Sequence, residues 1–132
     1  MKDSKIVIGF LILAGLVGLY VGGGLLFFPA GMQEQNGIVI GDNASLFSET
    51  RAPGAAILGA SLMMLLAVIR VNWRSIGLVI AALFFLSYGL GRLLSLVLDG
   101  RPGDPLFYAM FGELILGGIA LILLYRSSKT TQ

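Results

Sequence analysis

Two charged residues interrupt long apolar stretches of the chain, and they are the first candidates for chemistry. Arg92 lies within the apolar run at residues 76–98, and Glu113 lies within the run at residues 106–125. On membrane-insertion scales, a charged side chain at the centre of a spanning helix costs about 2.5–3.5 kcal/mol, so such residues are rare and usually functional. Their presence predicts a polar site inside an otherwise apolar protein.

The two charged positions agree in depth. Arg92 stands seven residues before Asp99, where its run ends, and Glu113 stands seven residues after Leu106, where the next run begins. At 1.5 Å per helical residue, both lie about 10 Å below the same end of a helical hairpin. We therefore expect the two side chains to form an ion pair. The pair either serves only to clamp the hairpin or also engages a ligand or partner, and both interpretations stay open.

The polar pattern extends along the third apolar run. Tyr88, Arg92, Ser95 and Asp99 are separated by four, three and four residues, so they share one face of a helix. A polar stripe in lipid is expected to point into the bundle. Glu49 and Arg51, at the start of the second apolar run, lie at the same end of the bundle as this stripe. The complete candidate cluster for ligand binding or another function is Arg92, Glu113, Asp99, Ser95, Tyr88, Glu49 and Arg51.

The composition excludes several kinds of chemistry. The chain contains no Cys and no His. Disulfides and thiolate nucleophiles are therefore absent, as are the commonest metal ligand and the commonest general base. We expect no metal site and no cofactor, and we assign no catalytic residue. The net charge of +2 is best explained by membrane topology, so we expect no nucleic-acid partner.

The chain is too apolar for a soluble domain. Of its 132 residues 57% are hydrophobic and 12% charged, against roughly 45–50% and about 25% in soluble proteins. Four apolar runs, at residues 6–28, 51–69, 76–98 and 106–125, each approach the ~20 residues that span a bilayer as a helix. Backbone groups in lipid must be satisfied within the segment, so these runs are expected to be helices. The sequence predicts one all-α membrane domain over residues 1–132, an up-down-up-down four-helix bundle.

Basic residues in the short connections predict the orientation. One side of the membrane carries Lys2, Lys5, Arg70, Arg74, Arg126 and Lys129. The other side carries Arg51 and Arg101. Because Lys and Arg are enriched in cytoplasmic connections, we expect both termini in the cytoplasm and the segment 29–50 outside. The polar cluster then lies in the outer half of the bundle. The inner half has almost no polar side chains, which argues against a continuous channel and favours a blind pocket.

The external segment and the helix starts carry local signals. Asn36-Gly37 is a turn signal, and residues 38–40 after it are expected to form a short strand or a lid over the bundle. Thr50 is the expected cap of the second helix, with Pro53 in its first turn.

Small residues recur at four-residue spacing. Ala14, Gly18 and Gly22 follow this pattern, and so do Ala55 and Gly59. Such faces let helices approach closely. We expect them to pack within the bundle, with contacts in a homo-oligomer as the alternative.

The motifs around the cluster resemble a known family. They read Glu49-x-Arg51-Ala52-x-Gly54, Gly91-Arg92-x-x-Ser95-x-x-x-Asp99-Gly100-x-Pro102 and Glu113-Leu114-x-Leu116-Gly117. The chain resembles the small bacterial four-helix membrane proteins catalogued as domain of unknown function 4345. The resemblance covers about Glu49 to Tyr125 together with the first helix. It implies the fold and a bacterial inner membrane, and it brings no activity. More distantly, the layout is similar to DoxX-like proteins and, in fold only, to sterol-isomerase-like bundles.

These observations favour a small, multi-spanning, non-enzymatic membrane protein. It is expected to be an accessory subunit or a lipophile-binding protein with a charged outer-leaflet pocket. Its expected partners are membrane lipids and a lipophilic small molecule. One alternative is a membrane enzyme acting on a quinone, sterol or isoprenoid through the carboxylate of Glu113 or Asp99. The other is a purely structural subunit of a larger membrane complex.

Overall fold

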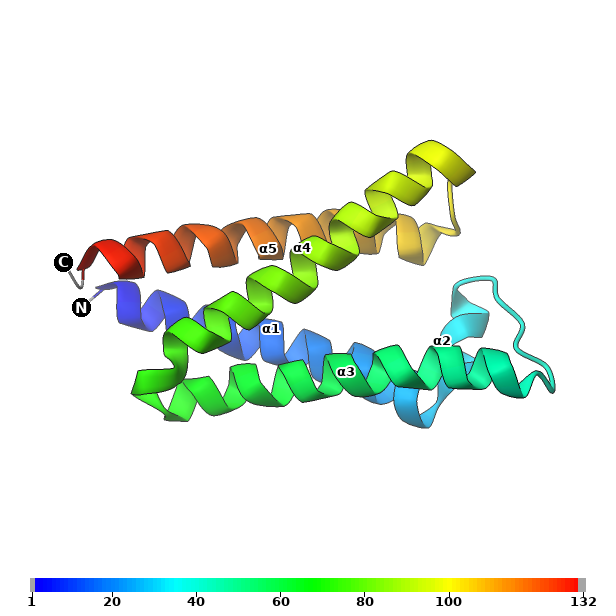
Figure 1. Ribbon diagram of the computed structural model, residues 1–132, viewed down its shortest axis with the longest axis horizontal. Helices are drawn as coiled ribbons and strands as arrows, with labels where there is room; N and C mark the ends of the chain where they lie inside the picture. The colour runs from blue at the N-terminus through cyan, green and yellow to red at the C-terminus, as the bar shows by residue number, and fades with distance from the viewer. Residues whose placement is uncertain (1, 131–132) are drawn as a thin grey trace.

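The computed structural model describes residues 2–130, and all the regular secondary structure within them is helical (Figure 1). Its elements are α1 (Lys2–Phe27), α2 (Pro29–Gln35), α3 (Ala44–Ile69), the 3₁₀ turn η1 (Val71–Trp73), α4 (Arg74–Asp99) and α5 (Asp104–Thr130). Helices α1, α3, α4 and α5 are each long and apolar enough to cross a membrane. The predicted all-α fold with four spanning helices is confirmed, and the chain is a multi-pass membrane protein.

The four long helices form two pairs, α1 with α3 and α4 with α5 (Figure 1). The start of α1, the end of α5 and the turn η1 lie at one end of the bundle, which we call the termini end. Helix α2 and the α4–α5 connection lie at the opposite end, the α2 end. From η1, α4 runs diagonally away from α3, so the two pairs diverge toward the α2 end.

Glycines bring the members of each pair into close contact. A Cβ added to Gly22 of α1 would lie 2.5 Å from the backbone nitrogen of Leu58 in α3. A Cβ added to Gly117 of α5 would lie 3.0 Å from the nitrogen of Leu86 in α4. Small residues therefore permit backbone approach in both pairs. Gly59, by contrast, has no atom within 4 Å of such a Cβ, so its face of α3 is not used in the bundle.

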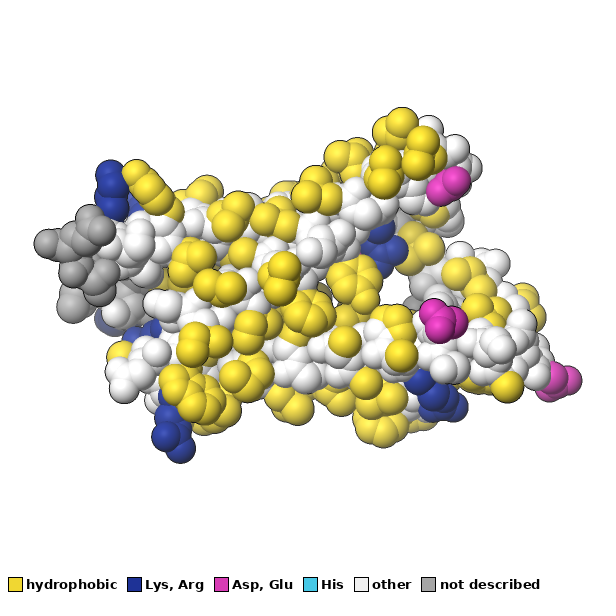
Figure 2. Space-filling model, viewed as in Figure 1, with side chains coloured by type: hydrophobic (Ala, Val, Ile, Leu, Met, Phe, Trp, Pro, Cys, Tyr) yellow, Lys and Arg dark blue, Asp and Glu magenta, His cyan; other side chains and the backbone are white. Residues whose placement is uncertain are grey.

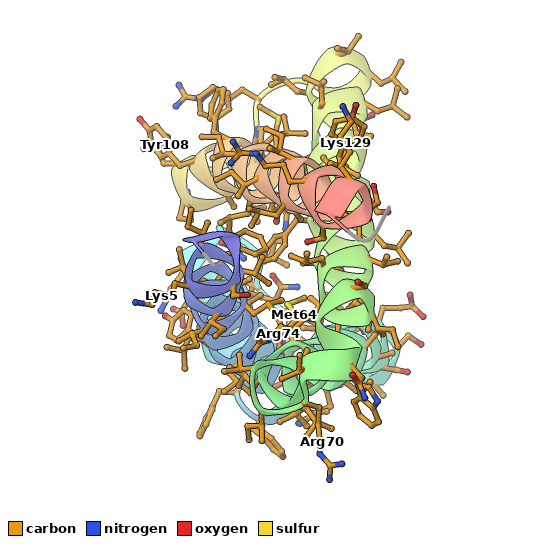
Figure 3. The ribbon with its side chains drawn as sticks, turned by 90° about the vertical axis from the view of Figure 1, so that its left-hand side faces the viewer. Lys5, Met64, Arg70, Arg74, Tyr108 and Lys129 are labelled. Atoms are coloured by element: carbon orange, nitrogen blue, oxygen red, sulfur yellow. The ribbon has the colours of Figure 1, made fainter. Side chains whose placement is uncertain are left out.

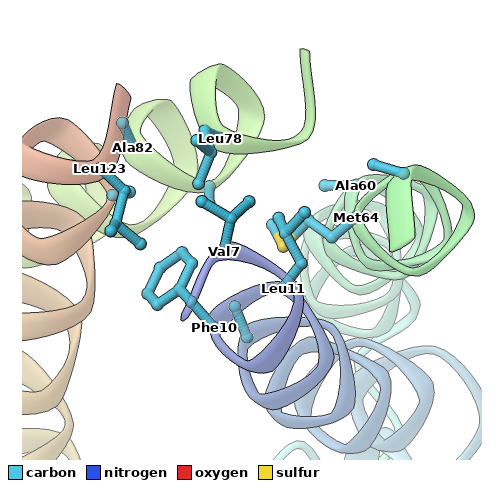
Figure 4. Packing of buried hydrophobic residues seen from close by; sticks show 12 residues of the cluster. Val7, Phe10, Leu11, Ala60, Met64, Leu78, Ala82 and Leu123 are labelled. Atoms are coloured by element: carbon cyan, nitrogen blue, oxygen red, sulfur yellow. The ribbon is translucent and has the colours of Figure 1, made fainter. Parts of the chain in front are cut away.

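Most of the packed core lies toward the termini end, where the two pairs meet. Figure 4 shows Phe10 and Leu11 of α1 among side chains of the other long helices, including Met64, Leu78 and Leu123. Leu11 and Leu78 are completely buried. Because the pairs diverge beyond this core, their separation leaves space between them at the α2 end.

The termini end also carries basic side chains (Figure 3). Arg70 points away from the bundle and its guanidinium lies 6.0 Å from the ring of Trp73. Arg74 points back between the helices, where its Nη2 donates to the carbonyl oxygen of Val68 at 3.4 Å. The acidic side chains visible in Figure 2 gather at the opposite, α2 end.

The second spanning helix begins earlier than expected. It starts at Ala44 and not at residue 51, because the side chain of Asn43 caps it by accepting a hydrogen bond from the nitrogen of Leu46 at 3.1 Å. The assignment of Thr50 as the cap is therefore wrong. Thr50 lies inside the helix, where its hydroxyl donates to the carbonyl oxygen of Leu46 at 2.8 Å.

The segment before α3 differs from the expected strand. Residues 38–40 form no strand within the described part of the chain, and residues 29–35 form the short helix α2 instead. Pro29 suits the first turn of that helix because its missing N–H would have no helical partner there. Gln33 of α2 donates from Nε2 to the Thr50 hydroxyl at 3.3 Å, which ties α2 to α3.

Candidate functional site

The centre of the site is a contact between α4 and α5. The Nε of Arg92 lies 3.1 Å from Oε1 and 2.9 Å from Oε2 of Glu113, and the two side chains are 29% and 16% exposed. The guanidinium carbon of Arg92 lies 5.7 Å from the centre of the Tyr88 ring, one helical turn earlier. A charge-assisted hydrogen bond of this kind is stronger than a neutral one, especially where water is scarce.

The local sequence explains why the two charges meet. Gly89 of α4 packs against α5, since a Cβ at this position would lie 3.2 Å from the nitrogen of Leu114. The two helices therefore approach each other closely beside Glu113. Arg92 follows Gly89 by three residues and so lies on nearly the same face of α4.

The ion pair leaves part of Arg92 unused. Both Glu113 oxygens accept from Nε alone. Within the described residues, neither terminal nitrogen of Arg92 has a hydrogen-bond partner. A guanidinium carries five N–H donors in a fixed fork, so four of them stay available on the side away from Nε.

A deep cavity lies beside the pair, between the two helix pairs. Its volume is about 220 Å³. All four long helices contribute to its wall, through Val17, Gly18, Val21, Leu25, Ile57, Ala60, Ser61, Met64, Phe84, Phe85, Tyr88, Arg92, Ala109, Gly112, Glu113 and Leu116. Arg92 and Glu113 are its only charged lining residues among those described. Ser61 is satisfied internally, since its hydroxyl donates to the carbonyl oxygen of Ile57 at 2.7 Å. The deep cavity is thus apolar except at the ion pair.

A second hollow, the mouth cavity, lies at the α2 end. Its volume is about 440 Å³. It takes polar side chains from α2 and the following turn, namely Gln33, Gln35 and Asn36, and from the start of α3, namely Glu49 and Thr50. Six residues line both hollows, and we call them the neck: Val21, Leu25, Tyr88, Arg92, Ala109 and Glu113. The two hollows therefore adjoin at the ion pair and make one amphipathic space, almost entirely apolar inside and with more polar side chains at its mouth.

Tyr88 and Arg92 also line a shallow hollow on the surface of α4. This side hollow, of about 390 Å³, is lined by Ser87, Tyr88, Gly91, Arg92 and Ser95, all of them on α4. Figure 2 shows the molecule hollowed between the diverging helix pairs toward the α2 end, with a basic side chain on the wall of the hollow.

A family model described as Domain of unknown function (DUF4345) matches residues 6–124. The chain belongs to this family. The match spans nearly all of the four long helices and includes every residue that lines the hollows of this DUF4345 protein. No curated protein and no solved structure matches the chain at a significant level.

The structure divides the predicted cluster of this DUF4345 protein into an inner and a peripheral group. Tyr88, Arg92 and Glu113 meet at the neck. Glu49 is exposed and lines only the mouth cavity, and Ser95 lines only the side hollow. Arg92 lines the deep cavity, the mouth cavity and the side hollow.

Two members of the predicted cluster line none of these hollows. Asp99 is exposed and accepts a hydrogen bond from the Ser95 hydroxyl at 2.9 Å. Arg51 lies within the α1–α3 pair. It donates to the carbonyl oxygen of Leu26 at 2.5 Å, and its guanidinium lies 5.6 Å from the ring of Phe47. The structure therefore does not bring Asp99 and Arg51 together with Arg92 in one hollow.

Sequence reasoning missed the polar wall supplied by α2. Gln33, Gln35 and Asn36 line the mouth cavity. No helix is predicted for this segment, although Pro29 followed by residues able to form a helix is a usable signal. Within the described residues, no group of three or more acidic residues is placed to hold a metal ion.

Proposed function

We propose that this DUF4345 protein is a non-enzymatic lipophile-binding protein, or an accessory subunit that binds a lipophile, in a bacterial inner membrane. The observation that carries the proposal is the amphipathic space with a single ion pair at its neck. Ligand sites are typically apolar clefts with a few polar groups that orient the ligand. An apolar chain fits the deep cavity and a polar head group fits the neck and mouth.

The size and chemistry of the deep cavity support an apolar occupant. Its volume of about 220 Å³ is far above the roughly 10–15 Å³ that one water molecule requires, and a bound water needs two to four polar partners. Few such partners exist below the neck, because Ser61 already donates to the chain. An apolar chain therefore suits this space better than water does.

The side hollow supports a ligand that comes from the bilayer, because it brings Tyr88 and Arg92 to the surface of α4. A molecule with an apolar chain reaches Arg92 from this surface. In this proposal Arg92 binds the head group through its free terminal nitrogens. Glu113 holds the guanidinium in place from the Nε side.

The distribution of basic residues supports an orientation with both termini in the cytoplasm. Lys5, Arg70, Arg74 and Lys129 lie at the termini end, and Lys and Arg favour the cytoplasmic side. The mouth cavity then opens in the outer half of the membrane.

Native mass spectrometry of the protein purified with its own lipids tests the proposal. The wild-type protein is expected to retain a small molecule at constant stoichiometry. Ala109→Phe places a ring in the neck and is expected to remove most of that molecule. Ala56→Phe adds the same ring on an exposed part of α3 outside the hollows and serves as the matched control. Equal retention in the two variants, or no molecule bound to any form, would contradict the proposal.

A further inference from the structure

We infer that the head group held at the neck is an uncharged hydrogen-bond acceptor, such as the carbonyl of an ester or ketone, and not a phosphate or carboxylate. This inference rests on the proposed function and names the ligand class of the same site. It follows from the charges and the unused donors around the neck.

The charges that line the joined hollows do not favour an anion. They are Arg92, Glu113 and Glu49, one positive and two negative, so the lining carries a net charge of −1. Arg92 is already paired through its Nε. Arg51, in the first part of α3, donates to the carbonyl oxygen of Leu26 and lies over the ring of Phe47, outside the hollows. A phosphate at the neck would therefore lie beside Glu113 without a second cation to balance it, and like charges at close range are strongly unfavourable where water is scarce.

The neck offers hydrogen-bond donors that have no partner in the protein. The two terminal nitrogens of Arg92 and the hydroxyl of Tyr88 have no hydrogen-bond partner among the described residues. These groups line the hollows, where they can donate to an acceptor on a ligand. A carbonyl oxygen has two lone pairs and no charge, so it can satisfy these donors without repelling Glu113.

A cationic head group fits the neck less well. Both oxygens of Glu113 already accept from Arg92. An ammonium group at the neck would lie beside the positive charge of Arg92. The carboxylate of Glu49 is exposed at the mouth, where water competes for it.

The deep cavity accounts for the rest of the ligand. Below the neck its wall is apolar and includes Met64, Phe84, Phe85 and Leu116. An amphipath that places its carbonyl at Arg92 would extend its chain along these side chains. A chain longer than the cavity continues past the neck toward the side hollow, which shares Tyr88 and Arg92 with the deep cavity.

Two probes with one chain and different heads test the inference. Monoolein carries an uncharged ester head, and oleoyl lysophosphatidic acid carries a phosphate. The full-length protein, freed of lipid in a maltoside micelle, is titrated with each probe at equal mole fraction and the occupancy is read by native mass spectrometry. Monoolein is expected to occupy the site at least about tenfold better, because a like charge next to Glu113 is costly. Ala109→Phe identifies site binding as the part of the signal that it removes.

Each outcome separates the inference from the proposed function. Equal or tighter site binding of the lysophosphatidic acid would overturn the inference and leave the lipophile site in place. If Ala109→Phe removes no binding of either probe, the proposed function fails as well. Glu113→Gln removes one negative charge and is expected to shift the ratio of the two occupancies toward the phosphate. The wild-type comparison decides the inference even if that variant does not fold.

Discussion

The guanidinium of Arg92 and the carboxylate of Glu113 lie in surroundings where neither charge is stable alone. Tyr88 and apolar side chains cover much of the pair, and its side chains are 29% and 16% exposed. The pair is thus neither a surface salt bridge, which contributes little, nor a fully buried one. Removing one partner leaves an uncompensated charge, whereas removing both leaves none.

Alanine substitutions test this pairing. Arg92→Ala or Glu113→Ala alone is expected to lower the free energy of unfolding by about 1–3 kcal/mol, between the values for exposed and buried pairs. The double variant is expected to be more stable than the worse single variant. Thermal unfolding of the three proteins in detergent measures the difference. A double variant that is no more stable than the worse single variant would show that the two side chains do not depend on each other.

The residues at the centre of the site were predictable, and those at its edge were not. Arg92 and Glu113 stand at matched depths on consecutive antiparallel helices. In an apolar environment each charge needs an opposite charge nearby. Asp99 and Arg51 lie near the ends of their helices, where water is an alternative partner. Sequence position alone therefore does not determine which way their side chains turn.

Among the elements, the contact between α1 and α3 depends on residues that have no side chain. The added Cβ of Gly22 would lie 2.5 Å from the backbone nitrogen of Leu58, and that of Gly54 would lie 2.7 Å from the nitrogen of Leu26. Backbone atoms on a packed helix cannot move aside as a flexible side chain can. The pair therefore has to separate if either glycine is replaced.

Adjacent glycines provide a matched test of this contact. Gly22→Ala is expected to destabilise the protein by about 1–3 kcal/mol, because it overpacks the interface. Gly23→Ala is expected to be neutral or to stabilise by up to ~1 kcal/mol through the higher helix propensity of alanine, since no atom lies within 4 Å of its Cβ position. Thermal unfolding in detergent compares the two. Equal destabilisation by both substitutions would mean that close approach at Gly22 does not hold α1 against α3.

The spanning helices were predictable as elements, but the segment between α1 and α3 was not. An apolar run of about 20 residues has few alternatives to a helix in lipid. Residues 44–50 contain Ser45, Ser48 and Glu49 and lack such a run, so they read as a loop. Their helix depends on the Asn43 cap, and its tie to α2 depends on the contact between Gln33 and Thr50. Such contacts between separate segments leave little trace in local composition.

At the scale of the whole molecule, the divergence of the two helix pairs creates the site. The packed core holds the pairs together toward the termini end, and the glycine contacts hold each pair internally. The amphipathic space then forms where the pairs separate. The proposed orientation places this space in the outer half of the membrane.

Cysteine labelling tests the orientation, since the chain has no Cys of its own. Asp42→Cys, in the exposed turn before α3, is expected to react with a membrane-impermeant maleimide in intact cells. Asn72→Cys, in the turn between α3 and α4, is expected to react only after the cells are made permeable. Both outcomes follow from the excess of Lys and Arg at the termini end. Reaction of Asp42→Cys from the cytoplasmic side alone would reverse the orientation.

The central claim is that the space between the helix pairs holds a lipophile in the living membrane. Site-specific photo-crosslinking tests it most directly, with p-azidophenylalanine in place of Phe85, which lines the deep cavity. The matched control carries the same group in place of Leu83, which is 60% exposed on the same helix. The claim predicts one discrete small-molecule adduct at position 85 and a spread of ordinary phospholipids at position 83. The same spread at both positions, or no adduct at position 85, would contradict it.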